Sequence, residues 1–241
     1  MIKITDLPKI LVIGKFNPSD LQVSVSESNR KIDSTIEAQL EQIWQTKKAK
    51  ANEDGRICYN GISYRLNSLE EKDGKVILDF GTFEYKVRDG LIAIPEYFNL
   101  SEEYWRKGCF TCASIKTSDD RYVMVELSGK SMNDNKVDLV GGLMETNVAM
   151  TTGDDIFKSF YNELEEEACI TKKDIQQLCL RAVYVASGTN AAFYFEVILN
   201  VFSTELLARF KENKDADIKS LRVFTQAEYL GVLGTHDSLN K

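Results

Sequence analysis

From residue 109 onward, short strand patterns alternate with helix patterns, and this order most limits what the chain can fold into. We predict strands at 109–116, 121–127, 137–140, 180–186, 193–202 and 221–224, and helices at 155–168 and 204–211. Such alternation favours a sheet whose faces are covered by helices. The 241 residues are enough to bury a sizeable core in one large domain or in two smaller ones.

The first third of the chain mixes helix and strand signals. We expect two strands that pair with each other, at 9–14 and 21–26, and a helix at 35–50 that begins after Asp33 or Ser34. We also expect a hairpin of strands 57–59 and 62–66 around Asn60-Gly61, followed by a strand at 75–85. Periodicity fades between 87 and 107. The chain is therefore predicted to be α+β, with a smaller α+β N-terminal domain at residues 1–95 and a second domain at 106–236.

Charge and composition exclude several kinds of partner. Lys and Arg number 30 against 37 Asp and Glu, and the net charge of −7 repels a phosphate backbone, so we expect no nucleic-acid partner. The longest apolar runs, 10–13 and 191–195, are far shorter than the ~20 residues of a membrane helix, so we expect no membrane partner. Five cysteines without a preceding secretory segment are predicted to be reduced thiols, which favours a cytoplasmic location.

The most informative segment is the acidic helix pattern at residues 154–170. At about 100° per residue, its apolar side chains form one core-facing stripe. Glu163, Glu166 and Glu167 fall together on the neighbouring arc, and Glu165 points away. Like charges at these spacings repel, so a cation is needed among them. A solvated acidic surface is the alternative interpretation.

A second feature, Gly141-Gly142 at a predicted strand end, precedes this helix and could present backbone carbonyls to the same cation. A tight turn is the alternative for the glycines alone. Mg²⁺ in proteins typically takes one or two carboxylates together with substrate phosphates, and it can activate a bound water. The combined pattern indicates a diphosphate hydrolase.

These residues resemble the signature of the Nudix hydrolases: glycine, five residues, glutamate, seven residues, then arginine-glutamate-apolar-any-glutamate-glutamate-any-glycine-apolar. Asp154 matches the first acid, and Glu163, Glu166, Glu167 and Ile170 match the core at the family's spacing. The chain departs from the signature in three ways. Asn162 replaces the arginine, Cys169 replaces the glycine, and the loop from 142 to 153 is about six residues longer than usual.

The resemblance implies a Nudix-type α/β/α sandwich with a mixed sheet. It implies that Glu163, Glu166 and Glu167 are the catalytic residues and hold Mg²⁺ or Mn²⁺, with the carbonyl of Gly142 or of Gly141 as a further ligand. Either one of these glutamates or an outside acid would deprotonate the attacking water, and Glu145 and Glu196 are candidates for the outside acid.

The N-terminal region resembles the UDP-glucose diphosphatase branch of the family, through Ile43-Trp44, residues 60–66 and residues 78–85. That branch implies a nucleotide-sugar substrate, UDP-glucose or UDP-galactose, cleaved to UMP and sugar 1-phosphate. Arg181, Arg65 and Tyr85 are candidate substrate-binding residues, although strand packing for Arg65 and Tyr85 and a surface ion pair for Arg181 stay open.

Two other functions also remain open: hydrolysis of ADP-ribose or another X-linked nucleoside diphosphate, and a non-catalytic nucleotide or protein binder of Nudix fold. The sequence is compatible with a monomer and with a homodimer.

Overall fold

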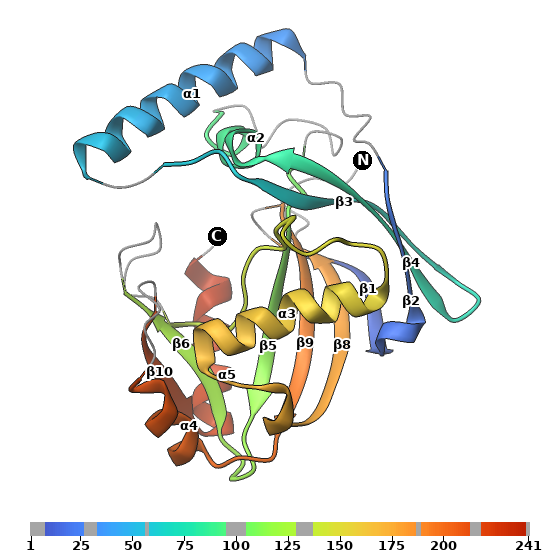
Figure 1. The fold of residues 1–241 in the computed structure, drawn as a ribbon, viewed down its shortest axis with the longest axis vertical. Helices are drawn as coiled ribbons and strands as arrows, with labels where there is room; N and C mark the ends of the chain where they lie inside the picture. The colour runs from blue at the N-terminus through green and yellow to red at the C-terminus, as the bar shows by residue number, and fades with distance from the viewer. Residues whose placement is uncertain are drawn as a thin grey trace.

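A computed structural model describes residues 8–26, 33–55, 58–94, 105–128, 137–186, 189–212 and 218–239. The main sheet has the strand order β1-β8-β9-β5-β6-β10, and β7 pairs with β6 (Figure 1). Its strands are β1 (Lys9–Phe16), β5 (Cys109–Lys116), β6 (Tyr122–Leu127), β7 (Val137–Asp138), β8 (Ile175–Val185), β9 (Ala191–Leu199) and β10 (Ile218–Phe224). The sheet is mixed, because β5 and β9 are parallel while the other pairs are antiparallel.

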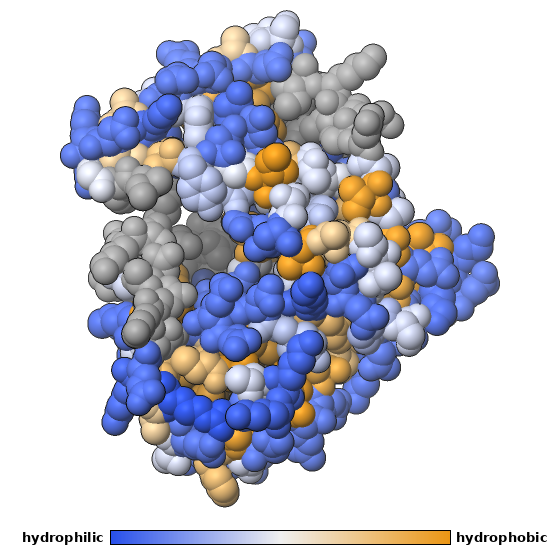
Figure 2. Space-filling view, in the orientation of Figure 1, coloured by the Kyte–Doolittle hydropathy of each residue, from blue (hydrophilic) through white to orange (hydrophobic). Residues whose placement is uncertain are grey.

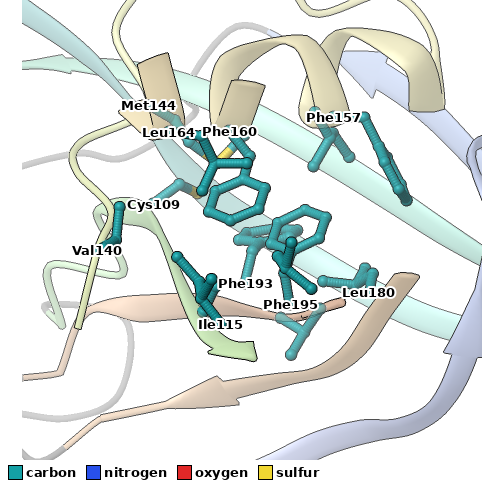
Figure 3. Packing of buried hydrophobic residues seen from close by; sticks show 14 of the residues in the cluster. Cys109, Ile115, Val140, Met144, Phe157, Phe160, Leu164, Leu180, Phe193 and Phe195 are labelled. Atoms are coloured by element: carbon teal, nitrogen blue, oxygen red, sulfur yellow. The ribbon is translucent and has the colours of Figure 1, made fainter. Parts of the chain in front are cut away.

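Helices cover both faces of this sheet. They are α3 (Gly153–Ala168), α4 (Ser203–Phe210) and α5 (Gln226–Leu239). On one face, Phe160 of α3 stacks on Phe195 of β9 with ring centroids 4.3 Å apart, within the core drawn in Figure 3. On the other face, Tyr229 of α5 stacks on Tyr122 of β6 at 4.5 Å. The expected α/β/α sandwich with a mixed sheet is therefore confirmed.

A second, three-stranded sheet lies beside the first. Its order is β2-β4-β3, with β2 (Leu21–Val25), β3 (Ile62–Lys72) and β4 (Lys75–Glu84). The predicted hairpin turn at Asn60-Gly61 is wrong, because the chain turns at Asp73-Gly74, where both residues have positive φ. An Asp-Gly pair also suits this turn, and placing it there allows a longer ladder, from Ile62 opposite Glu84 to Lys72 opposite Lys75.

Two helices lie together on one side of the small sheet (Figure 1). The predicted first helix is confirmed as α1 (Ser34–Glu53), and the Asp33 carboxylate accepts from the Thr35 N–H at 2.8 Å. The second is α2 (Tyr85–Leu91). Leu40 of α1 packs on Leu91 in a small separate cluster. No described helix has both the length and the apolar character needed to cross a membrane.

The predicted pairing of strands 9–14 and 21–26 is wrong. Strand β1 pairs with β8, and β2 pairs in parallel with β4. In this arrangement Val12 and Phe16 of β1 become buried in the core of the main sheet, burial that a local hairpin with β2 would not give.

Residues from both predicted domains share one core. Phe80 of β4 stacks on Phe193 of β9 at 5.9 Å, and Tyr64 and Leu66 of β3 belong to the same cluster. The division into residues 1–95 and 106–236 stays a prediction. The observed packing places the small sheet directly against the elements that form the candidate site.

Candidate functional site

The acidic helix α3 begins where the sequence directs it. The Asp155 carboxylate accepts from the Thr152 N–H at 2.9 Å, and this capping box fixes the first turn. Ile156, Phe160 and Leu164 are fully buried, as the stripe predicts. The exposed side of α3 is hydrophilic in the space-filling view (Figure 2). The buried stripe therefore determines which flank of the helix presents the glutamates.

Two of the three predicted glutamates line one cavity. Its volume is about 260 Å³, and its lining residues are Leu143, Glu145, Asn147, Ser159, Asn162, Glu163 and Glu166. Glu163 is half-buried and Glu166 is exposed. Asn162, which stands where the Nudix signature has arginine, also faces this cavity. Its described lining contains three carboxylates and no Lys or Arg.

The glycine pair is held between two strands. Residues 140–144 run antiparallel to the first half of β5, with the Thr111 N–H donating to the Gly142 carbonyl at 2.8 Å. On the other side, the Tyr64 N–H of β3 donates to the Met144 carbonyl at 2.9 Å. This segment thus links the small sheet to the main sheet through backbone hydrogen bonds.

Both glycines lie close to neighbouring atoms, but only Gly141 faces backbone that cannot shift cheaply. Gly141 has φ +148°, and a Cβ there would lie 2.0 Å from the Thr111 carbonyl oxygen. A Cβ on Gly142 would lie 2.4 Å from Oε2 of Glu163. The Gly141 N–H also donates to Oε2 of Glu167 at 2.9 Å. The segment therefore packs directly against the glutamate flank of α3.

The Gly142 carbonyl was expected to be a metal ligand. Its observed partner is the Thr111 N–H on β5, so that oxygen is directed toward the strand. Glu167 is engaged by Gly141 rather than lining the cavity. The ligand roles of Gly142 and Glu167 stay predictions.

One contact at this site was not predicted. The Tyr85 hydroxyl, at the start of α2, donates to Oε1 of Glu145 in the cavity wall. Burial, and then the neighbouring Glu145 carboxylate, raise the pKa of Tyr85, so the hydroxyl stays protonated and remains a donor. Because the two residues are far apart in sequence, no local pattern could have paired them.

The other predicted substrate-binding residues lie elsewhere. Arg65 is 7% exposed, and its backbone bridges to Gly108 rather than to the cavity segment. Arg181 pairs with Glu196, Nε to Oε2, at 3.8 Å. Phe195 faces α3, so its neighbour Glu196 points to the opposite face of the sheet. Arg181, which pairs with Glu196, lies on that face too. The structure does not bring Arg181 or Glu196 to the glutamates.

The first acid of the resemblance, Asp154, lies on the opposite flank of α3. It lines a different cavity of about 390 Å³ together with Lys158, Tyr161 and Lys172. Asp154 and Glu163 are nine residues apart, which places them about 180° apart around the helix. Asp154 is therefore separate from the glutamate cavity.

The donor chemistry at the cavity fits a hard divalent cation. As the side chains are placed, no group of three or more His, Cys, Asp or Glu in the described ranges could hold a metal ion. Nevertheless, Glu145, Glu163 and Glu166 all line one cavity, and carboxylate oxygens are the ligands that Mg²⁺ prefers. Binding would require these flexible side chains to converge.

No protein-family model and no curated protein matches the sequence. Among solved structures, a NUDIX hydrolase from Nitrosomonas europaea is similar at 17% identity and a TM-score of 0.36, over 53% of this chain and 78% of that one. The NUDIX domain of Shewanella oneidensis NrtR, complexed with ADP ribose, is similar at 10% identity and a TM-score of 0.40, over 52% of this chain and 77% of that one.

A bifunctional NMN adenylyltransferase/ADP ribose pyrophosphatase from Francisella tularensis is similar at 12% identity and a TM-score of 0.35, over 58% of this chain and 39% of that one. All three TM-scores are well below the level of a shared whole fold. What this site does is therefore inferred from its own residues.

Proposed function

We propose that this chain is a metal-dependent hydrolase of Nudix type that cleaves the diphosphate bond of a nucleoside diphosphate derivative. The observation that carries the proposal is the cavity that Glu163 and Glu166 of α3 line together with Glu145, beside the Gly141-Gly142 segment. This is the helix pattern that resembles the Nudix signature, placed against the glycines that precede it in sequence.

Mg²⁺ or Mn²⁺ would be held by Glu163 and Glu166, and it would neutralise phosphate charge and lower the pKa of a bound water. The role of the chain is to aim carboxylate oxygens into one cavity and to accept a proton from the attacking water. Asn162 and Ser159 line the same cavity and carry donors suited to phosphate oxygens.

The charge of the cavity makes the dependence on metal strict. Three carboxylates and no cationic side chain are among its described lining residues, so a diphosphate would be repelled without a cation. We expect hydrolysis to fall to background when the metal is chelated, and to return when Mg²⁺ or Mn²⁺ is added back.

For the substrate, we propose a nucleotide sugar, UDP-glucose or UDP-galactose, from the resemblance of the N-terminal region. A cavity of about 260 Å³ is below the usual range for drug-sized ligands, so it would take the diphosphate while the base and sugar contact other surfaces. Arg65 and Tyr85 remain proposed contacts for those groups, whereas Arg181 pairs with Glu196 on the sheet face away from α3. ADP-ribose or another X-linked nucleoside diphosphate is the alternative substrate.

The test is a panel of nucleotide sugars and ADP-ribose with Mg²⁺, with products identified by chromatography. Release of UMP and sugar 1-phosphate from UDP-glucose supports the proposed substrate, and release of AMP from ADP-ribose alone supports the alternative. Glu166→Gln should lower turnover at least about a hundredfold, the scale lost when a general base or an electrostatic stabiliser is removed. No metal-dependent release from any member of the panel would refute the hydrolase.

A non-catalytic binder is a second candidate, favoured by Asn162 and Cys169, which replace two residues of the signature. Such a protein would be stabilised thermally by nucleotides without turning them over, because a ligand that binds the native state raises its stability. Restoring the signature with Asn162→Arg separates the candidates. A binder would stay inactive after the change.

A further inference from the structure

We propose that Glu145 belongs to the cation-binding set of this site and that Tyr85, from the small sheet's side of the molecule, is the residue that positions it. This inference rests on the proposed function for the identity of the site, and it adds to that site two residues that lie outside the helix pattern. The Tyr85 hydroxyl donates to Oε1 of Glu145, which leaves the second carboxylate oxygen for another partner.

The backbone of Glu145 is fixed on the cavity side. It forms an antiparallel bridge with Ser63 of β3, and the Val148 N–H donates back to the Glu145 carbonyl at 3.5 Å. Its side chain lines the same cavity as Glu163 and Glu166, which are contributed by α3. Carboxylates from two separate elements thus line the same cavity.

The ring of Tyr85 contacts several neighbours. The Arg88 guanidinium lies 4.2 Å from the ring centroid, and the Tyr59 ring packs at 5.7 Å. Gly61 approaches closely as well, since a Cβ there would lie 2.7 Å from the Tyr85 ring. Tyr85 is 8% exposed. With the ring fixed, the hydroxyl has a defined position, and so does the carboxylate oxygen that it contacts.

This arrangement has a consequence for cation binding. A free glutamate loses rotamer freedom when it becomes a ligand, and Tyr85 restricts Glu145 beforehand. Groups that orient a metal ligand in this way typically change metal affinity by roughly 10–100-fold when they are removed. If the Tyr85–Glu145 contact only holds α2 against residues 140–146, its removal would instead lower stability and leave cation affinity unaltered.

The experiment measures Mn²⁺ affinity of the full chain by electron paramagnetic resonance, which needs no substrate. Tyr85→Phe keeps the ring and removes the donor, and we expect it to weaken Mn²⁺ binding about tenfold. Glu145→Gln keeps an oxygen acceptor for Tyr85 but removes the charge, and it should weaken binding at least as much. The double variant should bind Mn²⁺ no more weakly than Glu145→Gln alone, because Tyr85 acts through Glu145.

Tyr64→Phe is the matched control. The Tyr64 hydroxyl is also buried and donates to the Val148 carbonyl of the same loop at 3.1 Å, but it contacts no carboxylate. It should alter stability without altering Mn²⁺ affinity. Urea unfolding of every variant separates the two effects, and Glu145→Gln keeps the test decisive if Tyr85→Phe does not fold.

The inference is overturned if the unaltered chain binds no Mn²⁺, if Glu145→Gln binds it normally, or if Tyr85→Phe behaves as Tyr64→Phe does. These results are distinct from failure of the proposed function. If the variants lose Mn²⁺ affinity as expected but the unaltered chain hydrolyses no member of the substrate panel, the hydrolase alone is refuted. Hydrolysis that is unaffected by Glu145→Gln would refute the inference alone.

Discussion

The two adjacent glycines before α3 are expected to respond very differently to the same substitution. In Gly141→Ala the new Cβ would lie 2.0 Å from a backbone oxygen, at φ +148°, where L side chains are strained. The strained backbone costs about 1–3 kcal/mol and the overpacking a further ~1–3 kcal/mol. Loss of about 2–6 kcal/mol is therefore expected. Gly142→Ala instead meets the flexible end of Glu163, which can turn aside for about 0.5–1.5 kcal/mol.

Urea unfolding followed by circular dichroism measures both changes. With a slope of about 2 kcal/mol per molar urea, Gly141→Ala should lower the midpoint by about 1–3 M and Gly142→Ala by less than about 0.8 M. Gly142→Ala should nevertheless weaken Mn²⁺ binding, because it displaces the Glu163 carboxylate. Equal loss of stability in the two variants would show that the Gly142 contact is not with a movable side chain, and the reasoning would fail.

Three further predictions follow from the described contacts. Cys169 ends α3 at φ +55°, a left-handed conformation that is strained for any residue but glycine. Cys169→Gly should therefore raise the free energy of unfolding by up to about 1 kcal/mol, because relief of this strain exceeds the entropy that glycine loses on folding. A lower urea midpoint would contradict this. Burial alone would raise the pKa of Asp119, but hydrogen bonds from Ser203 and Thr117 outweigh it and lower that pKa to about 2. Because the folded pKa lies below the unfolded value, the stabilisation is present above about pH 4 and is lost as the pH falls toward 2. In Asp119→Asn the free energy of unfolding should therefore depend less on pH over that range. An unchanged pH dependence would refute the assignment. Finally, Arg181 pairs with Glu196 on the sheet face away from α3, so Arg181→Ala should leave kcat/KM within about twofold, whereas a phosphate contact would predict a loss of about tenfold or more.

Some of the site could be predicted because its information is local. The stripe of Ile156, Phe160 and Leu164 repeats at helical spacing, and burying it determines where Glu163 and Glu166 point. The strand at 109–116 was predicted with its observed bounds for the same reason, since alternation along a strand needs no knowledge of the partner strand.

Strand partners could not be predicted, because several edges compete for the same hydrogen bonds. Asn60-Gly61 and Asp73-Gly74 both suit a tight turn, and the longer ladder of β3 and β4 decided between them. Helix α5 was missed as well. Its glycines are poor helix formers, and its packing through Tyr229 against Tyr122 was not visible in the sequence.

The sequence by itself determined the acidic flank of α3, because residues three and four apart in a helix share a face whatever surrounds them. Only the tertiary structure decided that Tyr85 meets Glu145 and that Arg181 lies on the far face. Those placements depend on which strand edges pair and which apolar surfaces are buried together. Both depend on residues that are far apart in the sequence.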